Sequence, residues 1–453
     1  MSFFKKMRKR TPATLVLDTG NALNPSPRLN PFLAPLAEMK AKFMIKAMGQ
    51  MGYAAYLPGS YDFALGEERL SSLLHQAPFT VLQSGKGQRR LEGSKPYLFG
   101  DLFGIGMEVG LIGLSVADSP DEKALESTKL ALSAFLRKAK ERAAGLAMVL
   151  YSGPYRFLDG PILKDSPVNT VVLLSYEGAW WPKPKVSGNG RVLTVSIPSK
   201  GEFMGGLDLV MVDPGQPFAQ RFEWMLAFYK KRTLEGLLKN PGLKNRSLIE
   251  ERLRKADAEE SQMAKKNLYD WKVVPLDWHF QEDPSMRAEV DAFNAQIRNE
   301  YARRFASSVK GPKASEKVSS DRECKPCHAE AWSVWASTSH ARAFATLLKG
   351  KADKNPECVA CHSSGWNPEL RLVELDQGIA RPNVLCGNCH GNTPSHAKDP
   401  KAYPMASGAD KKACLGCHTA DHSPAFAFDA YLEAIRCDKG PKKAHKARPR
   451  IQG

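Results

Sequence analysis

The sequence predicts an α/β layered domain, then a helical connector, then a mostly irregular domain with short helices. Three observations lead to this division. Apolar strand-like runs alternate with amphipathic helices up to about residue 225, helical patterns dominate from 226 to 312, and none of the nine cysteines lies before residue 324. We therefore expect domains at 1–225, 226–312 and 313–453, and a chain of 453 residues is long enough for three.

Strands and helices alternate in the first domain. Two long stretches with helical spacing, 32–52 and 121–145, predict helices with Gly52 and Gly145 at their C-caps. Short apolar runs predict strands at ATLVLD (13–18), AMVLYS (147–152), TVVLLSY (170–176) and RVLTVSI (191–197). This alternation is typical of a layered α/β domain.

The connector begins with two predicted helices. The first, from residue 221, ends at Pro241 and Gly242. The second opens at Ser247, which forms a predicted capping box with Glu250. We expect a packing role for this region.

A short strand and a third helix complete the connector. The run WKVVPLDW (271–278) is strand-like, and Asp283 with Pro284 predicts the start of the next helix. The run 307–320 has the composition of a linker and leads into the last domain.

The composition is that of an ordinary globular protein, with 43% hydrophobic and 25% charged residues. The formal charge is +17, but basic residues are mixed with acidic ones except in 5–10 and 439–450, which we interpret as solvated tails. This scatter argues against nucleic acid as a partner. No apolar run is long enough to span a membrane.

The strongest signal is a repeated cysteine motif. Eight cysteines form four CxxC pairs, and each pair is followed by histidine: Cys324–Cys327–His328, Cys358–Cys361–His362, Cys386–Cys389–His390 and Cys414–Cys417–His418. In a CxxCH motif the two thiols add across the vinyl groups of haem, and the histidine binds the iron as proximal ligand. The sequence therefore predicts four covalently attached c-type haems.

Zinc ribbons and disulfides are the alternatives for such pairs. Two CxxC pairs can form a four-thiolate zinc site, but this needs no histidine after each pair. A CxxC disulfide is usually catalytic rather than structural. The four histidines favour haem over both.

Further histidines are candidates for the distal iron ligands. Outside the motifs, the segment after residue 320 contains four: His340, which we place on the helix after the first motif, His396, His422 and, in the basic tail, His445. We expect His340, His396 and His422 to bind iron, and we assign no role to His445. Cys437 is either a small buried thiol or a thiolate ligand.

The C-terminal residues resemble a known cytochrome family. Order and spacing of the four motifs from Asp321 to Arg436 are similar to the tetrahaem cytochromes that carry electrons in hydroxylamine oxidation. The resemblance implies compactly stacked haems, with His340 and His396 as distal ligands and little regular structure. Relatives commonly have histidine about where Cys437 stands, so one distal ligand is Cys437, His445 or an open position.

The first domain resembles the calcineurin-like metallophosphoesterases of the nucleotidase branch. The resemblance rests on TLVLDTGNAL (14–23), MIKAMGQMGYAAYLPGSYDFALG (44–66) and the run 183–213, and it lacks the family's first strand. That family holds two metals with Asp, His and Asn at strand ends. The resemblance implies an N-terminally truncated α/β sandwich of this type.

Residues at the family's metal-binding positions have been replaced. Asp62 fits the pattern, but Asn21 stands for the bridging Asp, Ser60 for an Asn, and Tyr61 for the catalytic His. Ser152, Tyr176 and Gly178 stand where further metal-binding histidines are expected. The one histidine before residue 279, His75, we interpret as a surface residue at a helix end. We therefore expect a pseudoenzyme domain without catalytic residues.

Together these features predict an electron carrier. We expect a multihaem c-type cytochrome that transfers electrons between other redox proteins in respiration, and we expect this respiration to be anaerobic. An oxidoreductase with one open haem, a residual phosphoesterase and an interaction module with structural haems are the alternatives.

Covalent haem attachment takes place outside the cytoplasm in bacteria, so we expect a periplasmic or extracellular protein. No signal peptide is visible, and we expect the native reading frame to start upstream.

Overall fold

The computed structural model separates the chain into two compact units, Met1–Glu289 and Val290–Gly453. Each unit is described by itself. The structure describes residues 1–24, 29, 34–85, 91–116, 120–158, 161–175, 183–197, 203–276, 280–306, 321–349, 353, 356–364, 381–391, 393–405, 410–418, 423 and 425–437.

A six-stranded sheet forms the centre of the first unit. Its order is β4-β5-β6-β7-β9-β8; the four central strands are parallel, and both edge strands run antiparallel to their neighbours. The central strands read as continuous apolar runs because both faces are covered. The strands are β4 (Tyr97–Gly100), β5 (Val109–Ser115), β6 (Leu146–Ser152), β7 (Thr170–Ser175), β8 (Lys185–Ser187) and β9 (Val192–Ser196).

Two smaller sheets complete this unit. One is the parallel sheet β1-β2-β3, and in the other β12 lies between an antiparallel β10 and a parallel β11. The strands are β1 (Val16–Asp18), β2 (Tyr53–Tyr56), β3 (Thr80–Val81), β10 (Phe203–Val210), β11 (Phe218–Gln220) and β12 (Asn267–Pro275). β12 contains residues 271–275 of the strand expected in the connector at 271–278, and it pairs into this sheet.

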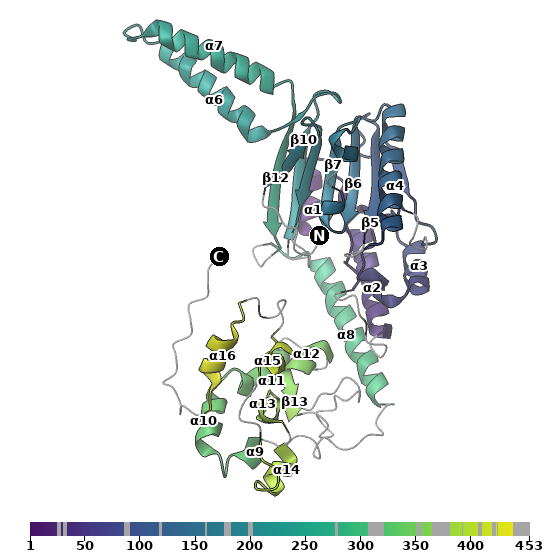
Figure 1. Ribbon diagram of the computed structural model, residues 1–453, viewed down its shortest axis with the longest axis vertical. Helices are drawn as coiled ribbons and strands as arrows, with labels where there is room; N and C mark the ends of the chain where they lie inside the picture. The colour runs from purple at the N-terminus through teal and green to yellow at the C-terminus, as the bar shows by residue number, and fades with distance from the viewer. Residues whose placement is uncertain are drawn as a thin grey trace. The chain divides into compact units, whose positions relative to one another are not determined.

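The core lies on both faces of the central sheet. On one face, α4 (Glu122–Glu141) buries Leu132, Phe135 and Leu136 against β5 and β6. On the other face, side chains of β10 and β12 pack against β5, β6 and β7, so the two sheets stack (Figure 1). A third cluster joins α2 (Ala34–Gln50) and α3 (Glu67–His75) to the small parallel sheet. The predicted α/β layered fold is confirmed.

The predicted helix ends agree with the structure in part. Gly52, with φ of +72°, follows α2 as expected. Gly145 does not end α4, because Ala143 already adopts the left-handed conformation, and Ala144 N–H donates to the carbonyl of Ala139 at 2.9 Å. The predicted Gly145 C-cap is therefore wrong.

The connector helices form a hairpin. α6 (Arg221–Leu238) ends before Pro241 as expected and packs along α7 (Arg246–Met263). The capping box predicted at Ser247 is wrong, because α7 begins earlier, with Asn245 at the N-cap in the left-handed conformation and no side-chain cap. Asp283 does cap α8 (Pro284–Ala306), since its Oδ1 accepts from Met286 N at 3.3 Å.

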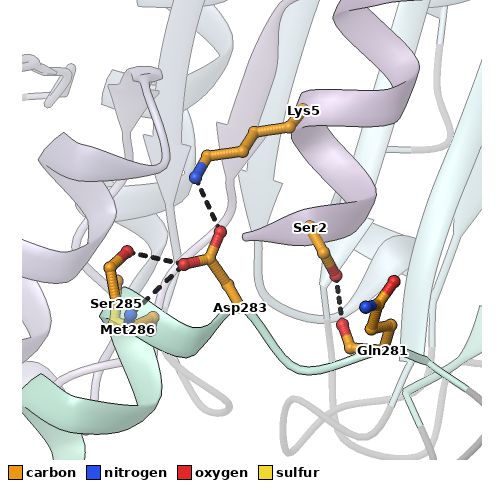
Figure 2. A network of polar contacts seen from close by, with 6 residues as sticks. All are labelled: Ser2, Lys5, Gln281, Asp283, Ser285 and Met286. Atoms are coloured by element: carbon orange, nitrogen blue, oxygen red, sulfur yellow. Dashed lines mark hydrogen bonds and ion pairs between the residues drawn. The ribbon is translucent and has the colours of Figure 1, made fainter.

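The N-terminal basic run is not a solvated tail, which corrects the expectation. Residues Ser2–Arg10 form α1, whose Phe3 packs against Phe280. Lys5 forms an ion pair with Asp283 at 2.7 Å, and Ser2 donates to the carbonyl of Gln281 (Figure 2). The helix forms because its apolar face finds a partner that its own sequence does not reveal.

After α8, the described residues of the C-terminal unit form short helices and a two-stranded ladder between β13 (Ser363–Ser364) and β14 (Arg381–Pro382). For these residues, this agrees with the predicted scarcity of regular structure. Its helices are α9 (Asp321–Cys324), α10 (Ala329–Ser337), α11 (Ala343–Lys349), α12 (Pro356–His362), α13 (Gly387–His390), α14 (Thr393–Lys398), α15 (Lys411–Leu415) and α16 (Phe428–Ile435). The linker 307–320 and the basic tail 439–450 lie outside the described residues. No described helix is long and apolar enough to cross a membrane.

Candidate functional site

Each CxxCH motif forms one helical turn. In three motifs the histidine N–H donates to the carbonyl of the first cysteine, at 3.0 Å for His328, 3.0 Å for His390 and 2.9 Å for His418. The motif of His362 lies within α12. In a helical turn, residues at i, i+3 and i+4 share one face, so both thiols and the imidazole are on the same side. This is the geometry that attachment of one haem through two thioethers and an imidazole requires.

The motifs meet in two pairs through their thiols. A hydrogen bond from the Cys386 thiol lowers the pKa of Cys324 to about 7 and raises the pKa of Cys386, the donor. The first motif therefore contacts the third. A thiol contact with Cys361 likewise raises the pKa of Cys417, which joins the second motif to the fourth.

Two pairs of imidazoles have the spacing of ligands on one metal. The ring centres of His328 and His396 lie 6.1 Å apart with an interplanar angle of 28°, and those of His340 and His418 lie 6.1 Å apart at 69°. An imidazole nitrogen binds a transition metal at about 2 Å with the ring centre about 1 Å further, so two imidazoles on one metal have centres about 6 Å apart. Each pair joins a proximal histidine to a predicted distal one.

The outer nitrogens of three histidines have partners. His362 Nδ1 donates to the carbonyl of Ala343 at 2.7 Å, and His396 Nδ1 donates to the carbonyl of Tyr403 at 2.8 Å. His418 Nδ1 lies 2.9 Å from Ser423 Oγ. A proton held at Nδ1 leaves the lone pair of Nε2 for a metal, which is the usual arrangement of metal-bound histidine.

Burial favours the neutral form of the second pair. Burial and the neighbouring His418 both lower the pKa of His340, and burial lowers the pKa of His418. Only a neutral imidazole binds a metal, so these shifts favour ligation. The spacing, the Nδ1 partners and the neutral rings together fit haem iron.

The remaining predicted ligands are placed less completely. We expected His340 on α10, the helix after the first motif. It lies instead in the 3-10 turn His340–Arg342, because α10 ends at Ser337. His422 and His445 lie outside the described residues. Cys437 lies near the third motif: burial raises the pKa of Cys389, and the neighbouring thiols of Cys414 and Cys437 raise it further. The thiol of Cys437 is 3.7 Å from the carbonyl of Ile435.

Sequence reasoning missed the groups that orient these rings. The partners of Nδ1 in His362 and His396 are the backbone carbonyls of Ala343 and Tyr403, and residue type does not reveal a backbone contact. Ser423 could not be told apart from the other serines of the sequence. Phe426 stacks on His418 with ring centres 4.7 Å apart at 14°, and Tyr431 meets the same ring edge-on at 5.6 Å. Within the described residues, no three His, Cys, Asp or Glu side chains lie together as ligands of one metal ion.

The phosphoesterase-like loop is held by a buried carboxylate. Asp62 is fully buried, and its Oδ2 accepts from Tyr56 Oη at 2.6 Å, Gly59 N at 2.7 Å and Asn21 N at 3.0 Å. Its Oδ1 accepts from Leu23 N at 2.9 Å. Burial raises the pKa of Asp62, and the four hydrogen bonds oppose that rise. Asp62 therefore uses both oxygens to join the two loops.

Two loops come together around Asp62. Asn21, in the left-handed conformation at φ of +62°, accepts from Tyr61 N through Oδ1 at 2.8 Å. Gly20 leaves no room for a side chain, since a Cβ there would lie 2.5 Å from Gly59 N. Burial raises the pKa of Asp18, at the end of β1, to about 7. The structure thus brings together Asn21, Ser60, Tyr61 and Asp62.

The structure describes two of the four remaining positions singled out in this domain. Ser152 is buried at the end of β6, and Tyr176 and Gly178 lie outside the described residues. His75 is exposed at the end of α3, as predicted.

One known family is similar to part of the C-terminal unit. Residues 323–391 match the family model described as cytochrome c554 and c-prime. This part of the chain is similar to a c-type cytochrome, and that family implies covalently bound c-type haem. Among curated proteins, no sequence match was found.

Solved structures similar to the chain are phosphoesterase-like. Thermus thermophilus sulfate thiohydrolase SoxB is 17% identical with a TM-score of 0.37 and aligns over 58% of this chain and 46% of its own. A 5'-nucleotidase precursor from the same organism is 21% identical, with a TM-score of 0.35, over 46% of this chain and 44% of its own. Bacillus subtilis calcineurin-like phosphoesterase YfkN is 16% identical, with a TM-score of 0.34, over 46% and 74%.

This chain spans less than half the length of the SoxB and nucleotidase chains. The α/β layered fold stated above rests on the sheet topology of the chain itself.

Proposed function

We propose that this chain is a multihaem c-type cytochrome that carries electrons between extracytoplasmic redox partners in anaerobic respiration. The observation that carries the proposal is the pair of imidazole couples, His328 with His396 and His340 with His418, at 6.1 Å. An iron with two imidazole ligands has no position for a substrate and is suited to electron transfer.

Four haems are proposed, one for each motif. The thiols would attach them, and the imidazoles of His328, His362, His390 and His418 would be the proximal ligands, with His340, His396 and His422 as distal ligands. The haems would supply one-electron redox chemistry when bound. The chain contributes the ligand spacing, the Nδ1 partners and the contacts between motifs. The thiol contacts support neighbouring positions for the first and third motifs and for the second and fourth.

We propose a scaffold or docking role for the first unit. Asn21, Ser60 and Tyr61 stand where a two-metal phosphoesterase needs an Asp, an Asn and a His, and their described contacts are within the two loops. We also propose that the chain divides into three domains at 225 and 312 and that it lies in the periplasm or outside the cell. The first domain would be a pseudoenzyme.

A second candidate function follows from the incomplete set of distal ligands. Imidazole couples are found for the first and fourth motifs, at His328 and His418. If neither Cys437 nor His445 supplies the fourth distal ligand, one haem keeps an open position. An open haem would bind a small nitrogen species, which favours an oxidoreductase.

The two candidates differ in their response to small ligands. For a carrier we expect every haem of the oxidised protein to be low-spin, and cyanide or nitrite to leave the visible and electron paramagnetic resonance spectra unchanged. For an oxidoreductase, a high-spin component shifts when either ligand is added. A redox titration of the same sample should show several one-electron steps, and a spectrum that does not respond to dithionite would contradict both.

A further inference from the structure

The helix α6 exposes an apolar stripe along its outer face. Phe222 is 63% exposed, Leu226 54% and Tyr229 59%, with Met225 at 36% and Leu237 at 43%. Phe222, Met225, Leu226 and Tyr229 follow i, i+3, i+4 and i+7, and Leu237, at i+15, falls close to the same side of the helix. We call these five residues the α6 stripe. Exposed apolar residues that gather on one face usually mark an interaction site.

The stripe faces away from the other helix of the hairpin. Ala227 and Leu234, on the opposite side of α6, are buried. Lys231 pairs with Asp257 of α7 at 2.5 Å, and Lys230 pairs with Glu259 at 2.8 Å. The hairpin extends away from the sheets of its unit (Figure 1). The stripe is therefore not the hairpin's own core.

The hairpin that presents the stripe has a positive net charge. Residues 221–266 contain 12 Lys and Arg against 7 Asp and Glu, a net charge of +5. Helical spacing places Arg221, Arg232 and Lys239 along one edge of the stripe and Lys230 along the other, beside Glu223.

Most acidic side chains of the hairpin are engaged within it. Glu235 pairs with Arg232 at 3.3 Å and Glu251 with Lys255 at 2.7 Å. At the tip of the hairpin, Lys239 and Lys244 are exposed. Of the flanking cations, Arg232 and Lys230 are the ones paired with acidic side chains, by Glu235 and Glu259. The surface presented by the stripe is thus apolar in the middle, with Arg221 and Lys239 as basic groups on one edge and Lys244 at the tip.

We propose that the α6 stripe binds the surface of an anionic lipid bilayer. Phe, Leu and Met side chains would enter the boundary between headgroups and acyl chains, Tyr229 would lie at headgroup level, and the flanking Lys and Arg would meet lipid phosphates. Each basic residue near an anionic membrane surface strengthens binding, and the apolar area adds to it.

Charge argues against a second copy of the chain as the occupant. Two stripes packed face to face in antiparallel orientation would bring Arg221 of one copy towards Lys239 of the other. Two hairpins of charge +5 repel each other, whereas an anionic surface attracts both. Lipid phosphate is therefore the better match for this rim.

Vesicle sedimentation of the full-length holoprotein tests the proposal. We expect binding to vesicles of phosphatidylcholine with about 30% phosphatidylglycerol, weaker binding to pure phosphatidylcholine, and release at high salt. Leu226→Glu should reduce the partition coefficient about tenfold or more, because it removes one side chain that would enter the bilayer and adds a negative charge. Leu130→Glu is the matched control, since Leu130 is a similarly exposed leucine, 62%, on α4.

Three outcomes would overturn the proposal. The first is no binding to the anionic vesicles, and the second is equal binding by Leu226→Glu and Leu130→Glu with unchanged circular dichroism. The third is a wild-type dimer, seen by light scattering, that Leu226→Glu dissociates while vesicle binding is unaffected. A Tyr229→Glu variant keeps the test decisive if Leu226→Glu does not fold.

Discussion

Replacing His396 by alanine is expected to convert one haem from low-spin to high-spin while the number of haems stays the same. The thiols that attach the haem are untouched, but the ring that lies 6.1 Å from His328 is lost. The iron then keeps one axial imidazole. Because axial ligands set haem potentials over a range of about 0.8 V, we expect a shift of about 0.1 V or more for that haem. Low-temperature electron paramagnetic resonance and a redox titration measure the two effects.

His75→Ala is the matched control for this variant, because His75 is an exposed histidine of the other unit. His340→Ala should give the same spin conversion at the haem of the fourth motif, where His340 pairs with His418. A fully low-spin spectrum in both His396→Ala and His340→Ala would show that neither residue is a distal ligand.

Asp62→Ala is expected to give the largest loss of stability in the first unit. The carboxylate of Asp62 accepts hydrogen bonds from the hydroxyl of Tyr56 and from three backbone N–H groups. In the variant these four donors would lose their acceptor at a fully buried residue. Each buried donor left without a partner costs about 1–3 kcal/mol, but removing the carboxylate also relieves the cost of burying it, so the free energy of unfolding should fall by about 3–5 kcal/mol in total. Denaturant unfolding followed by far-UV circular dichroism measures this fall.

Asp121→Ala removes the same carboxylate from an exposed helix N-cap, where it accepts from Ala124 N at 2.7 Å. That loss should be about 1 kcal/mol. The Soret band should stay unchanged in Asp62→Ala, since the haem motifs belong to the other unit. Equal stability losses in the two variants would contradict the role assigned to Asp62 as the residue that joins the two loops.

Long periodic segments of the fold could be predicted from the sequence. The helices α2 and α4 and the strands β6, β7 and β9 lie where apolar spacing indicated. Features that depend on distant contacts could not. The basic start of the chain becomes helical because Phe3 and Lys5 find Phe280 and Asp283, which are far away in the sequence.

Two helix ends predicted from local sequence were wrong, because a nearby residue adopts the left-handed conformation and sets the end of the helix at another position. Ala143 takes the left-handed conformation at the end of α4 before Gly145 is reached. Asn245 does the same at the start of α7, ahead of Ser247. Asparagine enters this conformation more readily than most residues, whereas alanine has a low intrinsic preference and adopts it where packing demands it.

The candidate site was predictable in its chemistry but not in its pairing. The CxxCH spacing predicts the attachment thiols and the proximal ligands, because one helical turn brings these side chains together locally. Which distal histidine faces which motif depends on the tertiary fold, and the structure pairs His396 with the first motif and His340 with the fourth. The backbone carbonyls that accept hydrogen bonds from Nδ1 of His362 and His396 cannot be recognised in a sequence, because every residue has such a carbonyl.

Haem stoichiometry tests the central claim most directly. Pyridine haemochrome absorbance of the purified holoprotein, divided by the protein concentration from amino-acid analysis, should give four c-type haems per chain. Intact mass spectrometry of the same sample under denaturing conditions should show the mass of four covalently retained haems. Fewer than four, or haem that is lost on denaturation, would contradict the account.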